Sequence, residues 1–134
     1  MYNGIHINRY VKRWLTSNPE LLALCPKSNM APLVISPSSY PTVTWMHGPI
    51  EPDYTKDGVI VDKVEVEILI VSNDYEQTID IAAAVRKAVE YQSYSDNDVT
   101  IPIITIQSIS EDAEADAYIQ SIVLSFEIES EREI

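Results

Sequence analysis

The sequence predicts an α+β fold: a single domain with a mostly antiparallel sheet of four or five strands and two main helices on one face. Three patterns indicate it. Residues 59–90 have the composition of a long strand, a polar break and an alanine-rich helix. Residues 5–15 have helical periodicity, and residues 100–129 alternate like two strands of a hairpin. The 134 residues, 46% of them hydrophobic, are enough to bury one core, so residues 1–134 are expected to form one domain.

The first helix is predicted over residues 5–15, where apolar residues recur at the spacing of one helical face. Arg9, Lys12 and Arg13 lie off this stripe and are expected to form a small basic face. The stripe itself consists of Ile7, Tyr10, Val11, Trp14 and Leu15.

A short second helix is predicted from Glu20 to Leu24. Asn18 is a favourable N-cap residue because its side chain can accept a backbone N–H of the first turn. Pro19 fits the first helical position, where its missing N–H leaves no hydrogen bond unmade. Residues 16–19 therefore separate the two helices.

Prolines interrupt residues 26–58, where two short strands are expected at residues 33–35 and 42–46. Proline cannot donate to a strand ladder, so both strands are expected at sheet edges or strand starts. Residues 48–58 begin and end with glycine and are expected to form a loop.

The long strand predicted at residues 59–71 has two different faces. One face is apolar throughout and consists of Val64, Val66, Ile68 and Ile70. The other changes along the strand from Glu65 and Glu67 to Leu69 and Val71. The strand is therefore expected to enter a more buried zone as it advances.

A helix from Tyr75 to Glu90 follows the polar break at residues 72–74. Asp74 and Gln77 have the spacing of a capping box, in which each side chain accepts from the other residue's backbone. The periodicity predicts a buried stripe of Tyr75, Ile79, Ala82, Val85 and Val89.

A hairpin is predicted at the end of the chain. Residues 100–109 are strand-like with an interruption at Pro102, and residues 110–116 form a charged connection. The second strand, residues 118–129, carries its apolar face on Tyr118, Gln120, Ile122, Leu124, Phe126 and Ile128. Glu127 and Glu129 lie on the opposite face.

The net charge of −12 is distributed unevenly. Residues 1–50 carry four basic residues and one acidic residue, whereas residues 51–134 carry five basic and twenty acidic residues. Direct sequence-specific binding of nucleic acid is not expected, because the acidic part has no basic patch to neutralise phosphates. No apolar run approaches the roughly 20 residues that span a bilayer, so no membrane partner is expected. The single Cys25 is expected to be a buried, reduced thiol.

Motifs for catalysis, metals and cofactors are weak, so neither an enzymatic activity nor a cofactor is expected. Residues 53–58 resemble the start of a calcium loop, but Val64 stands where that loop needs a glutamate. His6 and His47 with one cysteine are too few for a zinc site. There is no Gly-x-Ser-x-Gly elbow and no glycine-rich phosphate loop. A small hydrolase assembled from distant residues stays open as a third class, and it would need a deep pocket in which a histidine meets carboxylates.

Interaction surfaces are the candidate sites that remain. Edge strands that are not blunted pair with other chains, and aromatic residues and methionine are enriched at interfaces. Trp45 and Tyr118 have a second interpretation, packing in the core. The candidate interface residues are Arg9, Lys12, Arg13, Trp45, Met46, Asp53, Tyr54, Lys56, Asp57, Tyr118, Glu127 and Glu129.

Three segments together resemble one known family. Residues 5–11 lead to Ser-Asn-Pro-Glu-Leu at residues 17–21, similar to an opening short helix followed by Pro-Glu-Leu. Residues 40–45, Tyr-Pro-Thr-Val-Thr-Trp, are similar to a strand of that family. Residues 64–77 and the Ala-Ala-Val-Arg-Lys-Ala-Val helix after them resemble its core strand and helix. In this order they resemble the tail-completion family of long-tailed bacteriophages and prophages.

The resemblance implies a non-enzymatic structural protein of the virion, at the head–tail junction, that is assembled in the host bacterial cytoplasm. Such proteins are similar to tail terminators, which cap the finished tail tube as a ring, often of six subunits, and face the head connector. The implied partners are further copies of the chain, the tail-tube protein and the head-connector protein. A closed ring needs two complementary patches per subunit, which the basic first helix and the acidic remainder are expected to supply. An acidic lumen would also repel passing DNA.

A different class of function is the alternative. The chain is then a monomeric or dimeric, non-enzymatic binding module, such as an adaptor of a secretion or contractile-injection system. Ring formation would favour the tail-completion role, and a dimer would favour the adaptor.

Overall fold

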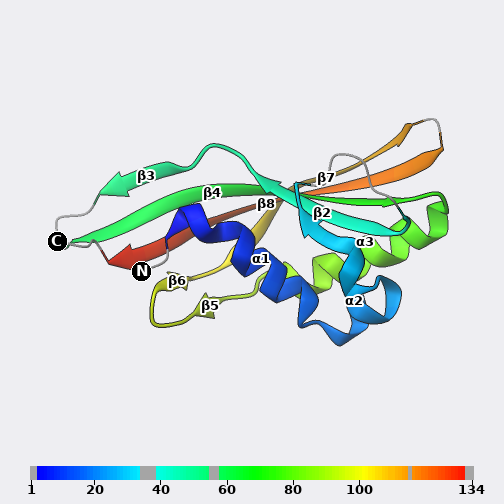
Figure 1. The fold of residues 1–134 in the computed structure, drawn as a ribbon. Helices are drawn as coiled ribbons and strands as arrows, with labels where there is room; N and C mark the ends of the chain where they lie inside the picture. Colours follow the sequence, from blue (N-terminus) through cyan, green and yellow to red (C-terminus); the bar gives the residue numbers. More distant parts are fainter. Residues whose placement is uncertain (1–2, 34–38, 55–57, 115, 132–134) are drawn as a thin grey trace.

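Figure 1 shows the computed structural model of the chain, in which residues 3–33, 39–54, 58–114 and 116–131 are described. These described residues form the α-helices α1 (Ile7–Thr16), α2 (Pro19–Leu24) and α3 (Tyr75–Val89). The strands are β1 (Met30–Pro32), β2 (Thr42–His47), β3 (Glu51–Tyr54), β4 (Val59–Ser72), β5 (Tyr94–Ser95), β6 (Val99–Ile101), β7 (Ile104–Glu114) and β8 (Ala117–Glu131). Short 3₁₀ helices occupy Gly4–His6 and Lys27–Asn29.

Two long antiparallel strands form the centre of the sheet. β4 and β8 pair along their whole length, from Val59 opposite Glu131 to Ser72 opposite Tyr118. The outer side of β4 pairs first with β3 and then with β2, and the outer side of β8 pairs with β7 and then with β6. β1 adds to β2 in the parallel direction, and β5 adds to β6.

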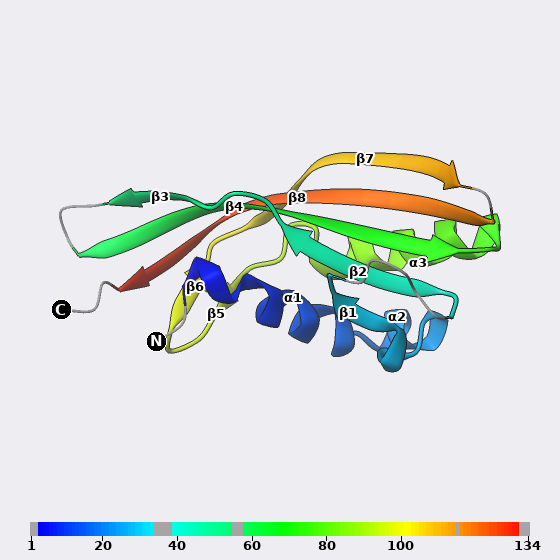
Figure 2. The same cartoon turned by 45° about the horizontal axis from the view of Figure 1, so that its top comes forward.

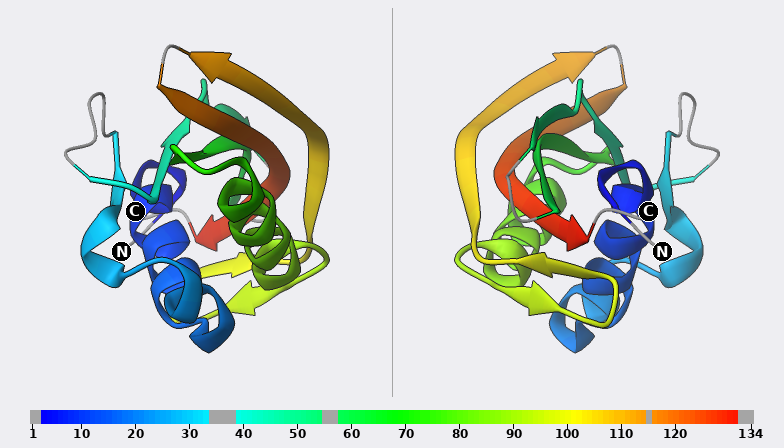
Figure 3. Two further views of the ribbon diagram at one scale, coloured as in Figure 1. Left: turned by 90° about the vertical axis from the view of Figure 1, so that its right-hand side faces the viewer. Right: turned by 90° about the vertical axis from the view of Figure 1, so that its left-hand side faces the viewer.

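The predicted sheet is therefore wrong in size and type, although the α+β class is right. The sheet has eight strands, is mixed rather than antiparallel, and curls into a half-barrel around the helices (Figure 3). Four of the strands are only two to four residues long. So short a segment gives too few alternations to be recognised, and β1 and β3 each contain a proline, which is tolerated because both are outer strands.

The core lies between the helices and the inner face of the sheet (Figure 2). The apolar face predicted for α1 is confirmed as buried: Ile7, Tyr10, Val11 and Leu15 are fully buried and Trp14 is half-buried. The predicted apolar faces of the two long strands are also buried, from Val64 to Ile70 in β4 and from Ile122 to Ile128 in β8. Burying one such aliphatic side chain stabilises the fold by about 1.5–3 kcal/mol, so this layer holds the molecule together.

The buried stripe predicted for α3 is wrong in part. Tyr75 and Ile79 are 39% and 38% exposed, although Val85 and Val89 are buried as expected. The buried face is rotated and consists of Thr78, Ile81, Ala84, Val85 and Val89. The helix lies on the concave side of the curled sheet (Figure 3), and the side of the helix that carries Tyr75 and Ile79 is left exposed.

The cap of α3 forms, but not as a reciprocal box. Asp74 Oδ1 accepts the backbone N–H groups of Glu76 and Gln77 at 3.1 and 3.4 Å. The N–H of Asp74 donates to Ser72 Oγ at 3.1 Å, and the Ser72 hydroxyl donates to Gln77 Oε1 at 2.6 Å. Ser72, at the end of β4, therefore replaces the direct contact from Gln77.

Two segments expected to be connections contain strands, and one expected strand lies elsewhere. Residues 51–54 of the expected loop form β3, and residues 110–114 of the expected charged connection continue β7. Of the strand expected at residues 33–35, only Leu33 is described: it lies in a turn with a φ of 58°, directly after β1, and residues 34–35 lie outside the described residues. The strand expected at residues 42–46 is confirmed as β2.

The α2 cap gives a first testable expectation. Asn18 Oδ1 accepts the backbone N–H of Leu21 at 2.9 Å, and Pro19 is the first helical residue, as predicted. Asn18→Ala removes this acceptor and should lower the free energy of unfolding by about 1 kcal/mol. Urea unfolding followed by circular dichroism measures the loss. Asn18→Asp, which keeps an acceptor, should stay close to the wild type, and equal losses in both variants would contradict the capping role.

Candidate interaction surfaces

The exposed face of α1 carries three basic residues. Arg9 and Lys12 are exposed on the helix, as the sequence predicts. Arg13 is half-exposed but turned towards a neighbouring segment, because its guanidinium donates to the Tyr94 hydroxyl and lies 3.9 Å from Asp96 Oδ2. It also lies 5.5 Å from the centre of the Tyr10 ring. Arg13 therefore fixes the β5–β6 hairpin to α1, while Arg9 and Lys12 present positive charge outwards.

Trp45 and Met46 are neighbours in β2 but point to opposite faces of the sheet. Trp45 is 1% exposed and its Nε1 donates to the carbonyl of Asn8 at 3.3 Å. Trp45 therefore packs in the core, which is the second interpretation that the sequence allowed for this residue. Met46 is 43% exposed on the outer face.

The outer face of the sheet near β3 is acidic. Strand register places Glu51, Lys63 and Glu127 in one row across β3, β4 and β8, and Asp53, Val61 and Glu129 in the next. Asp53 and Glu127 are exposed and Glu129 is half-buried, while Tyr54 is 69% exposed. Lys56 and Asp57 lie outside the described residues. In its described part, this face thus presents carboxylates on both sides of Lys63.

A second exposed surface lies at the far end of the β7–β8 hairpin. The rings of Tyr75 and Tyr118 meet edge to face with their centres 5.4 Å apart. The Tyr75 hydroxyl and the Gln120 amide both donate to Glu111 Oε2, at 2.8 and 2.9 Å. The start of α3 and the tip of the hairpin are therefore joined by an aromatic pair and a shared carboxylate.

Two isoleucines extend this surface away from the tip. Ile79 is one helical turn beyond Tyr75, which advances about 6 Å, and Ile109 is two strand residues before Glu111, about 6.6 Å in the same direction. All four apolar side chains are between 38% and 44% exposed. We call this set, Tyr75, Ile79, Ile109 and Tyr118 with Glu111 at its edge, the hairpin patch.

The sequence indicated only Tyr118 of the hairpin patch. Tyr75 and Ile79 were expected inside the α3 stripe, and Ile109 and Glu111 at the end of a strand and in a connection. The available signal is that acidic and apolar side chains are mixed without a clean alternation in the two segments around Tyr75 and Tyr118. Such mixing is typical of an element that extends beyond the layer covering it.

The Glu111 carboxyl should titrate below the ordinary range for glutamate. The hydrogen bonds from Gln120 and then Tyr75 lower its pKa in the folded state. The resulting stability is present above the unfolded pKa and is lost as the pH falls through the folded pKa. NMR titration of the side-chain carboxyl should show its pKa rise in Gln120→Ala and, by less, in Tyr75→Phe. An unchanged pKa in both variants would contradict this contact network.

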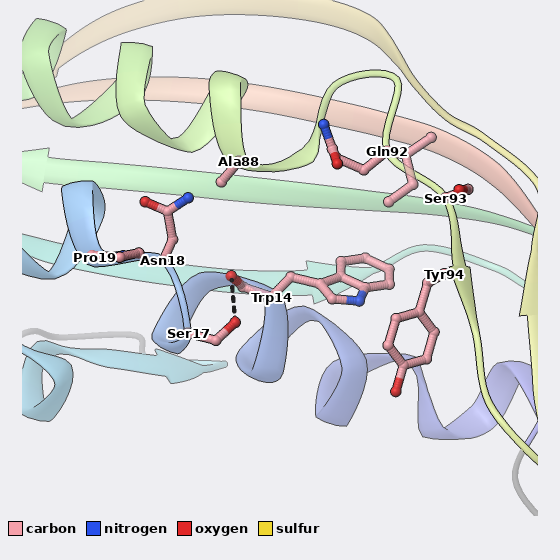
Figure 4. A pocket seen from close by; sticks show the side chains of 9 residues that line it. Trp14, Ser17, Asn18, Pro19, Ala88, Gln92, Ser93 and Tyr94 are labelled. Atoms are coloured by element: carbon pink, nitrogen blue, oxygen red, sulfur yellow. Dashed lines mark hydrogen bonds between the residues drawn. The ribbon is translucent and has the colours of Figure 1, made fainter.

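A cleft of about 250 Å³ lies between the end of α1 and the segment after α3 (Figure 4). Trp14 and Tyr94 form one side, with ring centres 6.1 Å apart. The lining residues are Trp14, Ser17, Asn18, Pro19, Ala88, Gln92, Ser93, Tyr94 and Ile104. The set contains no carboxylate, histidine or cysteine, so this cleft offers no acid–base pair for hydrolysis.

The two histidines and the cysteine that were candidates for metal binding or catalysis make local contacts or are buried. His6 Nδ1 accepts the Asn3 N–H at 3.2 Å, and His47 Nδ1 lies 2.6 Å from the Gly48 carbonyl. Burial raises the pKa of the Cys25 thiol to about 11, which keeps it protonated at neutral pH. Within the described ranges, no three His, Cys, Asp or Glu side chains are grouped to hold a metal ion. In the same part of the chain, no helix combines the length and the apolar composition that crossing a bilayer requires.

The exposed apolar and charged side chains described above are of the kinds found at protein–protein interfaces. The chain belongs to the tail completion protein gp17 family, which matches residues 9–129. The resemblance seen in the sequence is thereby confirmed, and the protein is a structural protein of bacteriophage tails.

A solved structure supports the fold independently. A chain of the virion of a native gene transfer agent particle superimposes with a TM-score of 0.71. The superposition covers 90% of this chain and 92% of that chain, at 17% sequence identity. No curated protein matches the chain. At this identity the similarity shows that the two chains share a fold.

Proposed function

We propose that this protein completes the phage tail at the head–tail junction, where it caps the tail tube as a ring and contacts the head connector. Membership of the tail completion family carries the proposal. The similar fold of a gene transfer agent virion chain supports a place in the particle itself. The protein acts as a non-enzymatic structural component and assembles in the host cytoplasm before it becomes part of the virion.

Two surfaces of opposite charge support ring assembly. The segment Ile7–Thr16 carries three basic residues and no acidic one, whereas residues 107–120 carry four acidic residues and no basic one. A contact between different patches on neighbouring subunits is head-to-tail, and such contacts close into a ring when the rotation between subunits divides a full turn. We expect six subunits.

The acidic outer face supports a passive role towards DNA. Carboxylates at Glu51, Asp53, Glu65 and Glu127 lie on one side of the sheet, where Lys63 is the lysine among the described residues. If this side borders the lumen, DNA phosphates are repelled and the genome passes without binding. The protein then needs no sequence-specific nucleic-acid contact, and its partners are the tail-tube protein, the head-connector protein and its own copies.

Binding to tail tubes tests the proposal. Purified tubes of the cognate tail-tube protein are mixed with the full chain and examined by negative-stain electron microscopy and co-sedimentation. We expect density at one end of each tube and a bound amount that scales with the number of tube ends. Binding along the tube wall, or no binding, would contradict the capping role, and a dimer that ignores tubes would favour an adaptor of a secretion or injection system.

A further inference from the structure

The hairpin patch has the features of a docking surface that remains open in the isolated chain. Its four apolar side chains are contributed by α3, β7 and β8 and are each exposed by more than a third. Acidic residues border them: Glu76 and Asp80 on α3 are exposed, as are Glu111 on the same face of β7 and Asp116 at the tip of the hairpin. An apolar centre with a charged rim is the usual composition of a protein interface.

The open edge of β7 lies beside the patch. Among the described residues β7 pairs with β8 alone, and its residues from Gln107 to Glu114 are exposed. An irregularity in register between Ile106 and Ser108, together with the acidic side chains, protects this edge against another strand of like charge. Two hairpin patches therefore repel each other, so an isologous dimer through this surface is disfavoured.

A matching surface lies along α1. Ile5, Arg9 and Lys12 follow one another at i, i+4 and i+7, so they share one side of the continuous 3₁₀ and α-helical segment. Ile5 is 74% exposed, and Arg9 and Lys12 are exposed. This side, which we call the α1 stripe, combines one large apolar side chain with two positive charges, the complement of the hairpin patch.

The two surfaces are placed for contact between copies rather than within one. In Figures 1 and 2 the start of α3 and the hairpin end lie at one end of the molecule, whereas the start of α1 lies towards the other. We propose that the hairpin patch of one subunit binds the α1 stripe of the next copy, with Ile5 against the tyrosines and isoleucines and with Arg9 and Lys12 against the acidic rim. This inference rests on the proposed ring and assigns its subunit interface.

A charge-exchange experiment tests the pairing. One variant reverses the stripe, with Arg9→Glu and Lys12→Glu, and a second reverses the rim, with Glu76→Lys and Asp80→Lys. In either variant alone, both contacting surfaces carry the same sign, so each should remain at monomer mass by light scattering where the wild type assembles. In an equimolar mixture every contact again joins opposite charges, so the mixture should recover the wild-type mass, with the two variants alternating by native mass spectrometry.

Controls separate this inference from the proposed function. Glu51→Lys with Glu65→Lys changes the net charge by as much as the rim variant does, but on the opposite face of the sheet. This control should assemble like the wild type. Circular dichroism must show the wild-type spectrum for every variant used. If the wild type assembles and both reversed variants still do so alone, or if mixing them restores nothing, the assigned interface is wrong while the ring stands. If the wild type itself fails to assemble, the ring and the interface are both contradicted.

Discussion

Trp45→Ala should lower the free energy of unfolding by about 3–5 kcal/mol. The indole is 1% exposed, lies on the inner face of β2 opposite Ile68, and donates from Nε1 to the Asn8 carbonyl. Truncation leaves a large cavity where the first helix meets the sheet and removes the partner of a backbone carbonyl. Urea unfolding monitored by circular dichroism measures the loss.

Met46→Ala provides the matched control, because Met46 is the next residue of the same strand. It is 43% exposed on the other face, so its truncation should change the free energy of unfolding by no more than about 0.5 kcal/mol. Similar losses in the two variants would contradict the assignment of Trp45 to the core. Wild-type stability of Trp45→Ala with loss of assembly would instead restore Trp45 as an interface residue.

Gly4→Ala should destabilise the protein by about 1–3 kcal/mol. Gly4 is buried, and its N–H donates to Asp62 Oδ2 at 3.0 Å. A Cβ atom at this position would lie 2.5 Å from the same oxygen, so either the 3₁₀ helix or the buried Asp62 side chain must move. The displaced carboxylate loses a hydrogen bond in a buried site, which accounts for the size of the effect.

Gly48→Ala is the control for this second substitution. An added Cβ at Gly48 meets no atom within 4 Å, so the free energy of unfolding should stay within about 0.5 kcal/mol of the wild type. Thermal and urea unfolding of both variants compare the two sites directly. A Gly4→Ala protein as stable as Gly48→Ala would show that the contact between the N-terminal segment and β4 contributes little.

The elements that the sequence predicts well are those in which periodicity and end signals agree. In α2, a side-chain cap and a proline mark the start of the helix, and the structure places both as expected. In β4 and β8, long alternating runs face a continuous helical layer, so one face is buried along most of each strand. Such elements bury enough surface to override local irregularities.

The errors arise where burial is decided by neighbours that are distant in sequence. Residues 110–114 are charged and still form a strand, because β8 extends far enough to pair with them beyond the helices. Residues 51–54 contain a proline and still form a strand, because β4 is longer than β2 and leaves an open edge for them. Neither fact can be read from the segment itself, since both depend on the length of a partner strand.

The candidate surfaces also divide into one that the local sequence pattern predicts and one that depends on distant parts of the chain. The positive charge of α1 is visible in sequence because charged residues off an apolar helical stripe must face outwards. The hairpin patch is not, because Tyr75 and Ile79 fit a helical stripe as well as the residues that are buried. The curvature of the sheet decides which stripe faces inwards, and that curvature is a property of all the strands together.

The mass of the wild-type chain in solution is the most direct test of assembly through complementary surfaces. Light scattering after size exclusion is carried out over a series of protein concentrations and salt concentrations. We predict a discrete multiple of the 15.1 kDa chain, expected to be six, that dissociates as salt screens the contact between the α1 stripe and the acidic hairpin. A monomer mass at every protein and salt concentration would contradict ring assembly through these surfaces.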